Sequence, residues 1–343
     1  MTTEPDSTAA LLRETATRLF QDLCQPAALR AAEGGNWQPA MWRAVEDAGL
    51  PLALLPEAGA TFNEAMVIVR AAGHFALPLP LPETMLAGWL LARAGLPVPS
   101  GPMTVAFGDD AHIAPDGPRF RLHGHAPRIP WARNCVSIVL MDASGLIAIL
   151  PAAACRIETG ENVAGEPRDT IGFDTLVDTA APSGLDPLRL RAVGAAMRAQ
   201  QIAGAMERIA AMTTQYAQER IQFGRPLGKF QAVQQNLAVL AGQTAAACAA
   251  ADLAADAVDD GMRLLALAAG KSRAGEAAGI GAAIAHQVHG AIGFTHEHAL
   301  HFLTKRLWSW RDEFGNETVW NRLLGRRMAE AGADRLWAEL TAA

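Results

Sequence analysis

Hydrophobic side chains recur at three- to four-residue spacing over the first hundred residues of the chain. One apolar stripe covers Leu11–Leu23, and another begins at Trp42 and ends where Gly49 stops the pattern. This spacing places the apolar side chains on one face of a helix, so it predicts amphipathic helices over about residues 8–95. Asn63 is the predicted N-cap of a further helix, because its short side chain can accept a hydrogen bond from the first turn.

Three prolines interrupt this helical pattern at Pro78, Pro80 and Pro82. A residue that precedes proline avoids the helical conformation, so the three prolines predict an extended crossing. The helical pattern then resumes over Thr84–Ala94.

Between Met103 and Val177 the pattern changes to short apolar or alternating runs that Gly, Asp and Pro separate. Runs of this length are typical of strands in a small barrel or sheet. The predicted strands are Met103–Phe107, Arg119–Leu122, Val136–Leu140 and Leu146–Leu150.

Long periodic segments return after Pro187. Three long helices are predicted, from Pro187 to about Ile221, from Phe230 to Asp259, and from Met262 to His289. A shorter helix covers residues 297–310, and the last one begins near Asn316, a second predicted N-cap. Long helices with short links between them predict an antiparallel bundle.

The predicted fold is therefore α+β and mostly helical. An N-terminal helical domain covers residues 1–100, and a small central β-barrel or sheet domain covers residues 101–182. A C-terminal four-helix bundle covers residues 183–343, so the 343-residue chain divides into three domains of ordinary size.

The composition excludes several classes of protein. Lys and Arg number 29 against 35 Asp and Glu, and this net charge of −6 argues against a nucleic-acid-binding protein, which would show a basic face. The four cysteines are far apart and form no Cys-x-x-Cys motif, so neither a zinc site nor a disulfide framework is indicated. We therefore expect a reduced, cytoplasmic compartment.

Targeting and membrane segments are not expected either. Residues 1–10 contain Glu4 and Asp6 and no basic stretch, which argues against a signal peptide. Apolar runs such as Leu50–Leu55 and Leu264–Ala269 are much shorter than the roughly 20 residues that a membrane-spanning helix needs.

The segment Gln218–Gln231 interrupts two long helices, because Gly224 and Pro226 stop helical structure. It carries three cations beside three amide and two phenylalanine side chains, and these cations are Arg220, Arg225 and Lys229. Such a group could hold a ligand that is anionic at one point and flat at another. The same residues would equally suit a solvated corner between two helices.

A second segment, His286–His298, contains the sequence Gln-Val-His-Gly-Ala-Ile-Gly-Phe-Thr from Gln287 to Thr295. Together the two segments resemble the paired signatures of the acyl-CoA dehydrogenase family, Arg-x-x-Phe-Gly leading to Phe-Gln and then Gln-x-x-Gly-x-x-Gly-Phe-Thr. Their order, spacing and helical context all agree. The resemblance implies a flavoprotein that uses FAD to introduce an α,β double bond into an acyl-CoA thioester and passes electrons to an electron-transfer flavoprotein.

Two parts of the family's flavin and substrate site are missing from this sequence. The resemblance leads us to expect a Thr-Glu-Pro segment followed by Gly-Ser in the β domain, but Gly108-Asp109-Asp110-Ala111 stands roughly there. The family's Trp-x-Thr is likewise replaced, by Arg128-Ile129-Pro130. The flavin ring and the thioester therefore lose the backbone and hydroxyl contacts that the family provides.

The catalytic base is also missing. The two positions at which family members carry this carboxylate fall on Phe314 and Gly194, and neither residue can accept a proton. Glu313 is one residue away, which on a helix end turns a side chain by about 100°. We interpret Glu313 as a solvated carboxylate at a helix end, and no residue of this chain is assigned as catalytic.

The residues that the family uses to hold the adenosine-pyrophosphate half of a neighbouring subunit's FAD are largely retained. Arg220 matches the pyrophosphate-binding arginine, whose guanidinium offers several charge-assisted donors to a diphosphate. The other residues that the resemblance assigns to FAD are Gln222, Phe223, Leu227, Phe230, Gln231, Gln287, Gly290 and Gly293. Ala291 replaces a usual glycine and Asn316 a usual threonine.

This asymmetry suggests a non-catalytic subunit. A larger catalytic paralogue would supply the base and the flavin seat, and this chain would complete the FAD site, as in the smaller subunits of the α2β2 enzymes that shorten steroid side chains. One alternative is a self-sufficient homodimeric dehydrogenase that uses Glu313 or another carboxylate. A second alternative is a structural or acyl-CoA-binding pseudoenzyme.

The histidines of the second segment also allow a metal-site interpretation. His296-Glu297 begins like a zincin motif, but Leu300 stands where the second histidine would be needed. His298 and His301 share a helix face without a matching set of cysteines or carboxylates. We therefore expect packing and capping roles for them and no metal site.

Overall fold

The computed structural model describes residues 7–33 and 35–341. Residues 1–6, which include both acidic residues behind the expectation of no signal peptide, lie outside this part. Contacts divide the chain into two compact units. One comprises the residues up to 65 together with 78–191, and the other comprises residues 66–77 and 192 onward. The division into three domains at residues 100 and 182 stays a prediction.

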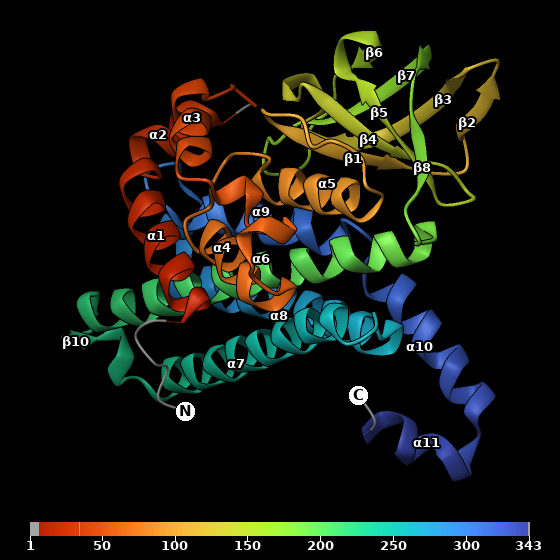
Figure 1. The fold of residues 1–343 in the computed structure, drawn as a ribbon. Coiled ribbons are helices and arrows are strands. Elements are labelled where there is room, and N and C mark those ends of the chain that lie inside the picture. Colours follow the sequence, from red (N-terminus) through yellow and green to blue (C-terminus); the bar gives the residue numbers. More distant parts are fainter. Residues whose placement is uncertain (1–6, 34, 342–343) are drawn as a thin grey trace. The chain divides into compact units, whose positions relative to one another are not determined.

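The first unit begins with short helices (Figure 1). They are α1 (Thr8–Leu23), α2 (Pro26–Ala32), α3 (Pro39–Asp47), the 3-10 turns η1 (Leu50–Leu52) and η2 (Pro56–Ala58), the start of α4 (Phe62–His74), and α5 (Leu81–Arg93). Gly49 ends the α3 segment in the left-handed conformation at φ 71°, as the sequence predicts for a glycine stop.

Two predictions about these helices are wrong in detail. The N-cap of α4 is Thr61 and not Asn63, because Thr61 and Glu64 form a reciprocal capping box: the Glu64 amide donates to Thr61 Oγ1 at 3.1 Å, and the Thr61 amide donates to Glu64 Oε2 at 2.9 Å. Pro82 lies in the first turn of α5 and not in an extended crossing. The first turn tolerates proline because its amides have no partner within the helix.

Two four-stranded sheets form the rest of the first unit (Figure 1). One has the order β1-β4-β5-β8, with β1 (Met103–Phe107), β4 (Ser137–Met141), β5 (Leu146–Pro151) and β8 (Ala180–Pro182). In it β1 and β4 are parallel and the other pairs are antiparallel. The second is antiparallel in the order β2-β3-β7-β6, with β2 (Ala111–Asp116), β3 (Arg119–Pro130), β7 (Arg168–Val177) and β6 (Cys155–Glu158).

A single hydrophobic core joins the two sheets. Leu122 and Ile171 come from one sheet and Ile138 and Leu150 from the other, and all four are fully buried in the same cluster. The four predicted strand runs are β1, β3, β4 and β5, which confirms a small β module between helical parts. The strands β2, β6, β7 and β8 were not singled out, because they are short or interrupted by glycine.

The second unit is a helical bundle. Its helices are α6 (Pro187–Glu219, from residue 192 onward), α7 (Gln231–Asp259), α8 (Leu264–His289), α9 (Leu300–Asp312), α10 (Glu317–Ala331) and α11 (Ala333–Thr341), with η5 (Leu227–Lys229) and η6 (Gly290–Phe294) between them. The antiparallel pair α7 and α8 lies side by side over much of its length (Figure 1). Asn316 caps α10 through its side-chain oxygen, as predicted.

Close backbone crossings hold this bundle together. A Cβ at Gly204 of α6 would overlap the carbonyl oxygen of Arg70 of α4, and a Cβ at Gly73 would overlap that of Gln201. At this crossing the two helix backbones come closer than any side chain would permit.

We expect Gly204→Ala to lower the free energy of unfolding by about 2–3 kcal/mol, because the added methyl group forces α4 and α6 apart. Gly242→Ala on α7 is the matched control, because a Cβ there has no described atom within 4 Å. It should be neutral or stabilising by up to about 1 kcal/mol, since alanine is the better helix former. Urea unfolding of the two variants and the wild type measures these free energies. An equal loss of stability in both variants would contradict a close backbone contact between α4 and α6.

Candidate functional site

The segment that follows α6 forms a tight hairpin. Ile221–Gln222 (β9) pairs with Arg225–Pro226 (β10), and both turn residues have positive φ, 51° for Phe223 and 78° for Gly224. These angles are typical of a type I′ turn, which suits the twist of a two-residue hairpin. The amide of Leu227 donates to the carbonyl oxygen of Arg220 at 2.8 Å and closes the base of the hairpin. The backbone therefore fixes the conformation of this loop.

The hairpin presents basic and apolar side chains to the outside. Phe223 is 89% exposed and Ile221 61% exposed. Arg220 is also exposed, and its guanidinium has no hydrogen bond or ion pair to any described residue. The guanidinium of Arg225, in contrast, lies over the ring of Phe230 at 4.2 Å. Arg220 thus remains available to an anionic ligand, while Arg225 is engaged within the hairpin.

The remaining predicted residues of this first stretch lie around the hairpin base. Gln222 is exposed on β9 and Gln231 is exposed at the start of α7. Leu227 and Phe230 are half-buried, and Phe230 contacts Phe223 edge to face at 6.1 Å between ring centroids. Five of the predicted residues and Arg220 therefore share one short loop.

The second stretch ends α8. Gln287 is exposed in the last helical turn, and Gly290 terminates the helix with φ 63°. Gly293 is buried in η6, where a Cβ would approach His289 Cβ to 2.9 Å. The ring of Tyr216 stacks on His289 at 4.4 Å. Because Tyr216 precedes Arg220 by one helical turn, the structure brings the two predicted stretches to the same end of the bundle.

The two positions that would carry a catalytic base also meet, although they are 120 residues apart in the sequence. A Cβ at Gly194 would overlap the ring of Phe314. The ring of Phe314 therefore occupies the space beside Gly194 of α6. A carboxylate side chain at residue 194 would need this same space. Neither Gly194 nor Phe314 has a side chain that can accept a proton.

Glu313 is buried and not solvated, so that interpretation of the sequence is wrong. Its side chain is 8% exposed and lies in an ion pair with Arg198, whose Nε donates to Glu313 Oε2 at 2.8 Å. The side chain of Arg198 is 2% exposed, and its guanidinium also donates to Gln201 and lies 5.5 Å from the ring of Phe314. The carboxylate is therefore held by a buried guanidinium.

Lys271 supports the same segment, and sequence reasoning missed it. Its ammonium is buried and donates to the carbonyl oxygens of Arg311 at 2.6 Å and Gly315 at 2.9 Å. Burial lowers the pKa of Lys271 to about 8, and Glu317 partly opposes this shift. The available signal was a lone lysine in the small-residue run Ala268–Gly281 of α8. Arg198 and Lys271 together fix the loop that carries Glu313.

In the β domain, the stretch Arg128-Ile129-Pro130 that replaces the expected Trp-x-Thr leads into buried aromatic packing. It is followed by Trp131, which is 3% exposed and has a positive φ of 56°. The Trp131 ring packs edge to face on Trp37 at 6.3 Å. No hydroxyl of this stretch is offered to a ligand, because Arg128, Ile129 and Pro130 carry none.

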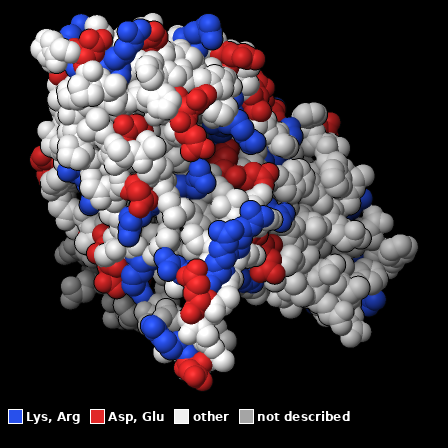
Figure 2. Space-filling model, turned by 90° about the vertical axis from the view of Figure 1, so that its right-hand side faces the viewer, with Lys and Arg blue, Asp and Glu red and all other residues white. Residues whose placement is uncertain are grey.

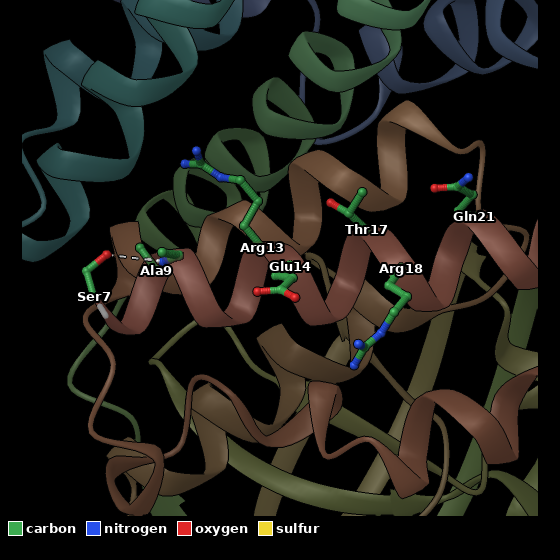
Figure 3. A pocket seen from close by; sticks show the side chains of 8 residues that line it. Ser7, Ala9, Arg13, Glu14, Thr17, Arg18 and Gln21 are labelled. Carbon is green, nitrogen blue, oxygen red and sulfur yellow. Dashed lines mark hydrogen bonds between the residues drawn. The ribbon is translucent and has the colours of Figure 1, made fainter. Parts of the chain in front are cut away.

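A cavity of about 460 Å³ lies elsewhere, along α1 (Figure 3). Ser7 and residues of α1 line it, and Arg13 and Arg18 point to opposite sides of the helix (Figure 3). The cations therefore do not converge on one ligand, and none of the predicted site residues lines this cavity.

Figure 2 shows how charged side chains are distributed over one face of the molecule. Lys and Arg side chains alternate there with Asp and Glu side chains and form no basic stripe (Figure 2). The helix α7 is long and apolar enough, by length and composition, to span a membrane. A bundle helix of a soluble protein passes the same test, so α7 is not placed in a membrane by this property.

A family model and a curated relative indicate the same family, and solved structures share the fold. Residues 191–329 match the family model described as acyl-CoA dehydrogenase, C-terminal domain. The chain is 30% identical over 320 residues to acyl-CoA dehydrogenase IpdE2 of Mycobacterium tuberculosis, which covers 88% of this chain and 91% of that protein. Among solved structures, the Tcur3481-Tcur3483 steroid ACAD variant superposes with a TM-score of 0.85 at 24% identity, covering 94% of this chain and 98% of that chain. The ChsE4-ChsE5 complex from Mycobacterium tuberculosis gives 0.83 at 23% identity, covering 97% of this chain and 100% of that chain.

Proposed function

The chain belongs to the acyl-CoA dehydrogenase family of oxidoreductases, and from this premise we propose that it is a non-catalytic subunit of an FAD-dependent enzyme. In this proposal a larger catalytic paralogue supplies the base and the flavin seat, and this chain completes the FAD site. The observation that carries the proposal is the ring of Phe314, which lies against Gly194, because the family resemblance places the base at these two positions.

The residues at the end of the bundle fit the adenosine-pyrophosphate half of FAD. The free guanidinium of Arg220 would bind the diphosphate, and the exposed amides of Gln222 and Gln287 would donate to it. Phe223 would pack on a flat group of the cofactor, since 89% of its surface is exposed. The loop is already ordered by the hairpin, so little conformational entropy would be lost on binding. When bound, FAD would supply the two-electron oxidation of the acyl-CoA.

The same chain does not fit the reactive half of the cofactor. Glu313 is committed to Arg198, Phe314 is apolar, and the stretch that ends in Trp131 is packed on Trp37. Proton removal from an acyl-CoA would therefore depend on a carboxylate of the partner. We propose that this chain contributes binding and orientation, and that the partner contributes the acid–base chemistry.

Two observations support a partner subunit. In the most apolar stretch of α7 only 28% of the residues are buried within this chain, so much of a hydrophobic helix faces outward. The solved structures with similar folds include the ChsE4-ChsE5 complex and a steroid ACAD, Tcur3481-Tcur3483. By analogy with these neighbours we propose a hetero-oligomer that acts on an acyl-CoA of the steroid side-chain class, with an electron-transfer flavoprotein as acceptor.

The test is to purify the chain alone and after co-expression with a longer paralogue that has Thr-Glu-Pro and a base. We expect the isolated chain to be colourless and inactive, and the co-purified complex to be yellow and to reduce a dye acceptor when acyl-CoA is added. An isolated chain that is yellow and active would identify a self-sufficient homodimer and end the proposal. A complex whose FAD content does not depend on this chain would identify a structural partner instead.

A further inference from the structure

His289 is buried at the end of α8 with one ring nitrogen unpaired. The residue is 3% exposed, and its Nδ1 lies 2.8 Å from the carbonyl oxygen of Ala285. A carbonyl oxygen can only accept, so Nδ1 carries the hydrogen and Nε2 keeps a lone pair. This Nε2 is buried and has no hydrogen-bond partner among the described residues. The ring stacks on Tyr216 at 4.4 Å and lies 4.7 Å from the ring of His298.

His286, one turn earlier, has the complementary tautomer. It is 7% exposed, and its Nε2 lies 3.0 Å from Thr304 Oγ1. That hydroxyl donates to the carbonyl oxygen of Leu300 at 3.3 Å, so Nε2 of His286 is the donor and Nδ1 keeps the lone pair. Nδ1 is buried and has no partner within the described chain. The His286 ring stacks on Phe294 at 4.3 Å and on Trp308 at 5.8 Å.

These two rings pack against the turn Gly290–Phe294. Phe294 of the turn stacks on His286, and Gly293 lies against His289 and His286 so closely that a Cβ would come within 2.9 Å and 3.4 Å of them. The turn therefore depends on the position of two imidazole rings that must remain neutral to stay buried.

The groups that face the two histidines do not favour a positive charge. His289 faces His286 and His298, and His298 in turn faces His301 of α9. The α6 side contributes the neutral ring of Tyr216. Burial lowers the pKa of His286, and burial followed by His298 and His286 lowers the pKa of His289, although its bond to Ala285 opposes the shift. The carboxyl end of α8 also favours a cation, but burial is the larger cause.

We propose that His286 and His289 form a proton-sensitive latch on the turn Gly290–Phe294, so that acidification releases the turn and with it the cofactor held across the subunit contact. The second half of this statement rests on the function proposed above, because it needs the turn to contact a partner's FAD. The first half concerns this chain alone.

The direction in which pH changes the opening of the turn follows from the lowered pKa values of His286 and His289. Above the ordinary histidine value of 6.5 both rings are neutral in the closed and the released turn, and the latch is fully closed. Below it the released turn binds protons that the closed turn excludes. Opening should therefore rise as pH falls, by about tenfold per pH unit for one histidine and about a hundredfold for two.

Hydrogen exchange of the whole chain tests the latch. Amides of residues 290–298, corrected for the intrinsic pH dependence of exchange, should lose protection at least tenfold between pH 6.5 and 5.5. His286→Phe and His289→Phe keep the stacked rings without a titrating nitrogen, so each should reduce this loss, and together they should remove most of it. His112→Phe, an exposed histidine of β2, is the matched control and should behave like the wild type. Unchanged wild-type protection down to pH 5.5 would overturn the latch even if a variant failed to fold.

The FAD content of the complex with the paralogue, after gel filtration at pH 7.5 and pH 5.5, tests the second half. We expect FAD to be lost at pH 5.5 from the wild type and retained by the double phenylalanine variant. If the wild type retains FAD at pH 5.5, the proposal that opening of the turn releases the cofactor is wrong. If no FAD binds at any pH, the proposed function fails, while the exchange experiment still decides the latch.

Discussion

Arg220→Ala should remove most of the FAD from the complex with the catalytic paralogue, weakening FAD binding by about 30- to 150-fold. The exposed guanidinium of Arg220 has no partner among the described residues, so its donors are free for a diphosphate. A charge-assisted bond to an anion contributes about 2–3 kcal/mol, which corresponds to that change in affinity. The measurement is the flavin absorbance per complex, together with a titration of the apo complex with FAD.

Two further variants make this result specific. Arg220→Lys keeps the charge and loses the forked geometry, so it should fall between the wild type and Arg220→Ala. Arg189→Ala removes another exposed arginine, from the other end of α6, where it pairs with Asp186, and should leave FAD content unchanged. Equal FAD content in Arg220→Ala and Arg189→Ala would show that the hairpin does not contact the cofactor, and the proposed role of this chain in completing the FAD site would fail.

Glu313→Gln should lower the free energy of unfolding by about 3–5 kcal/mol and leave the turnover of the folded complex unchanged. The substitution removes the carboxylate charge that pairs with the guanidinium of Arg198, whose side chain is 2% exposed. An unpaired buried charge has a cost of this size. Denaturant unfolding of the isolated chain gives the stability, and acceptor reduction per bound FAD gives the turnover.

The controls separate an ion pair from a catalytic base. Arg198→Met combined with Glu313→Met removes both charges and should recover much of the lost stability. Glu330→Gln on α10, whose partner Arg327 is 3.5 Å away at an exposed surface, should change stability by less than about 0.5 kcal/mol. If Glu313 is the base, Glu313→Gln lowers turnover by about 10²–10⁴-fold, and the chain is an active dehydrogenase.

The sequence by itself determined the parts of this protein that depend on local preference. Periodic apolar positions specified the long helices α6, α7 and α8 to within a few residues, because a helix of that length repeats its pattern many times. Short strands such as β6 and β8 give too few repeats to be recognised, and their pairing depends on distant partners. The cap of α4 was placed two residues late because Thr61 and Asn63 are both good caps, and only the bond to Glu64 distinguishes them.

Some residues of the candidate site could be identified from the sequence, and others only from the tertiary structure. Arg220, Gly290 and their neighbours could be named from two contiguous motifs, since the chemistry of each motif is local. Only the tertiary structure decided that the Phe314 ring lies against Gly194 and that Glu313 is paired with Arg198 inside the bundle. These pairs join residues more than a hundred positions apart, and burial changes a carboxylate from a possible proton acceptor into half of an ion pair. A linear pattern carries no record of such distances, so the role of Glu313 had to come from the packed helices.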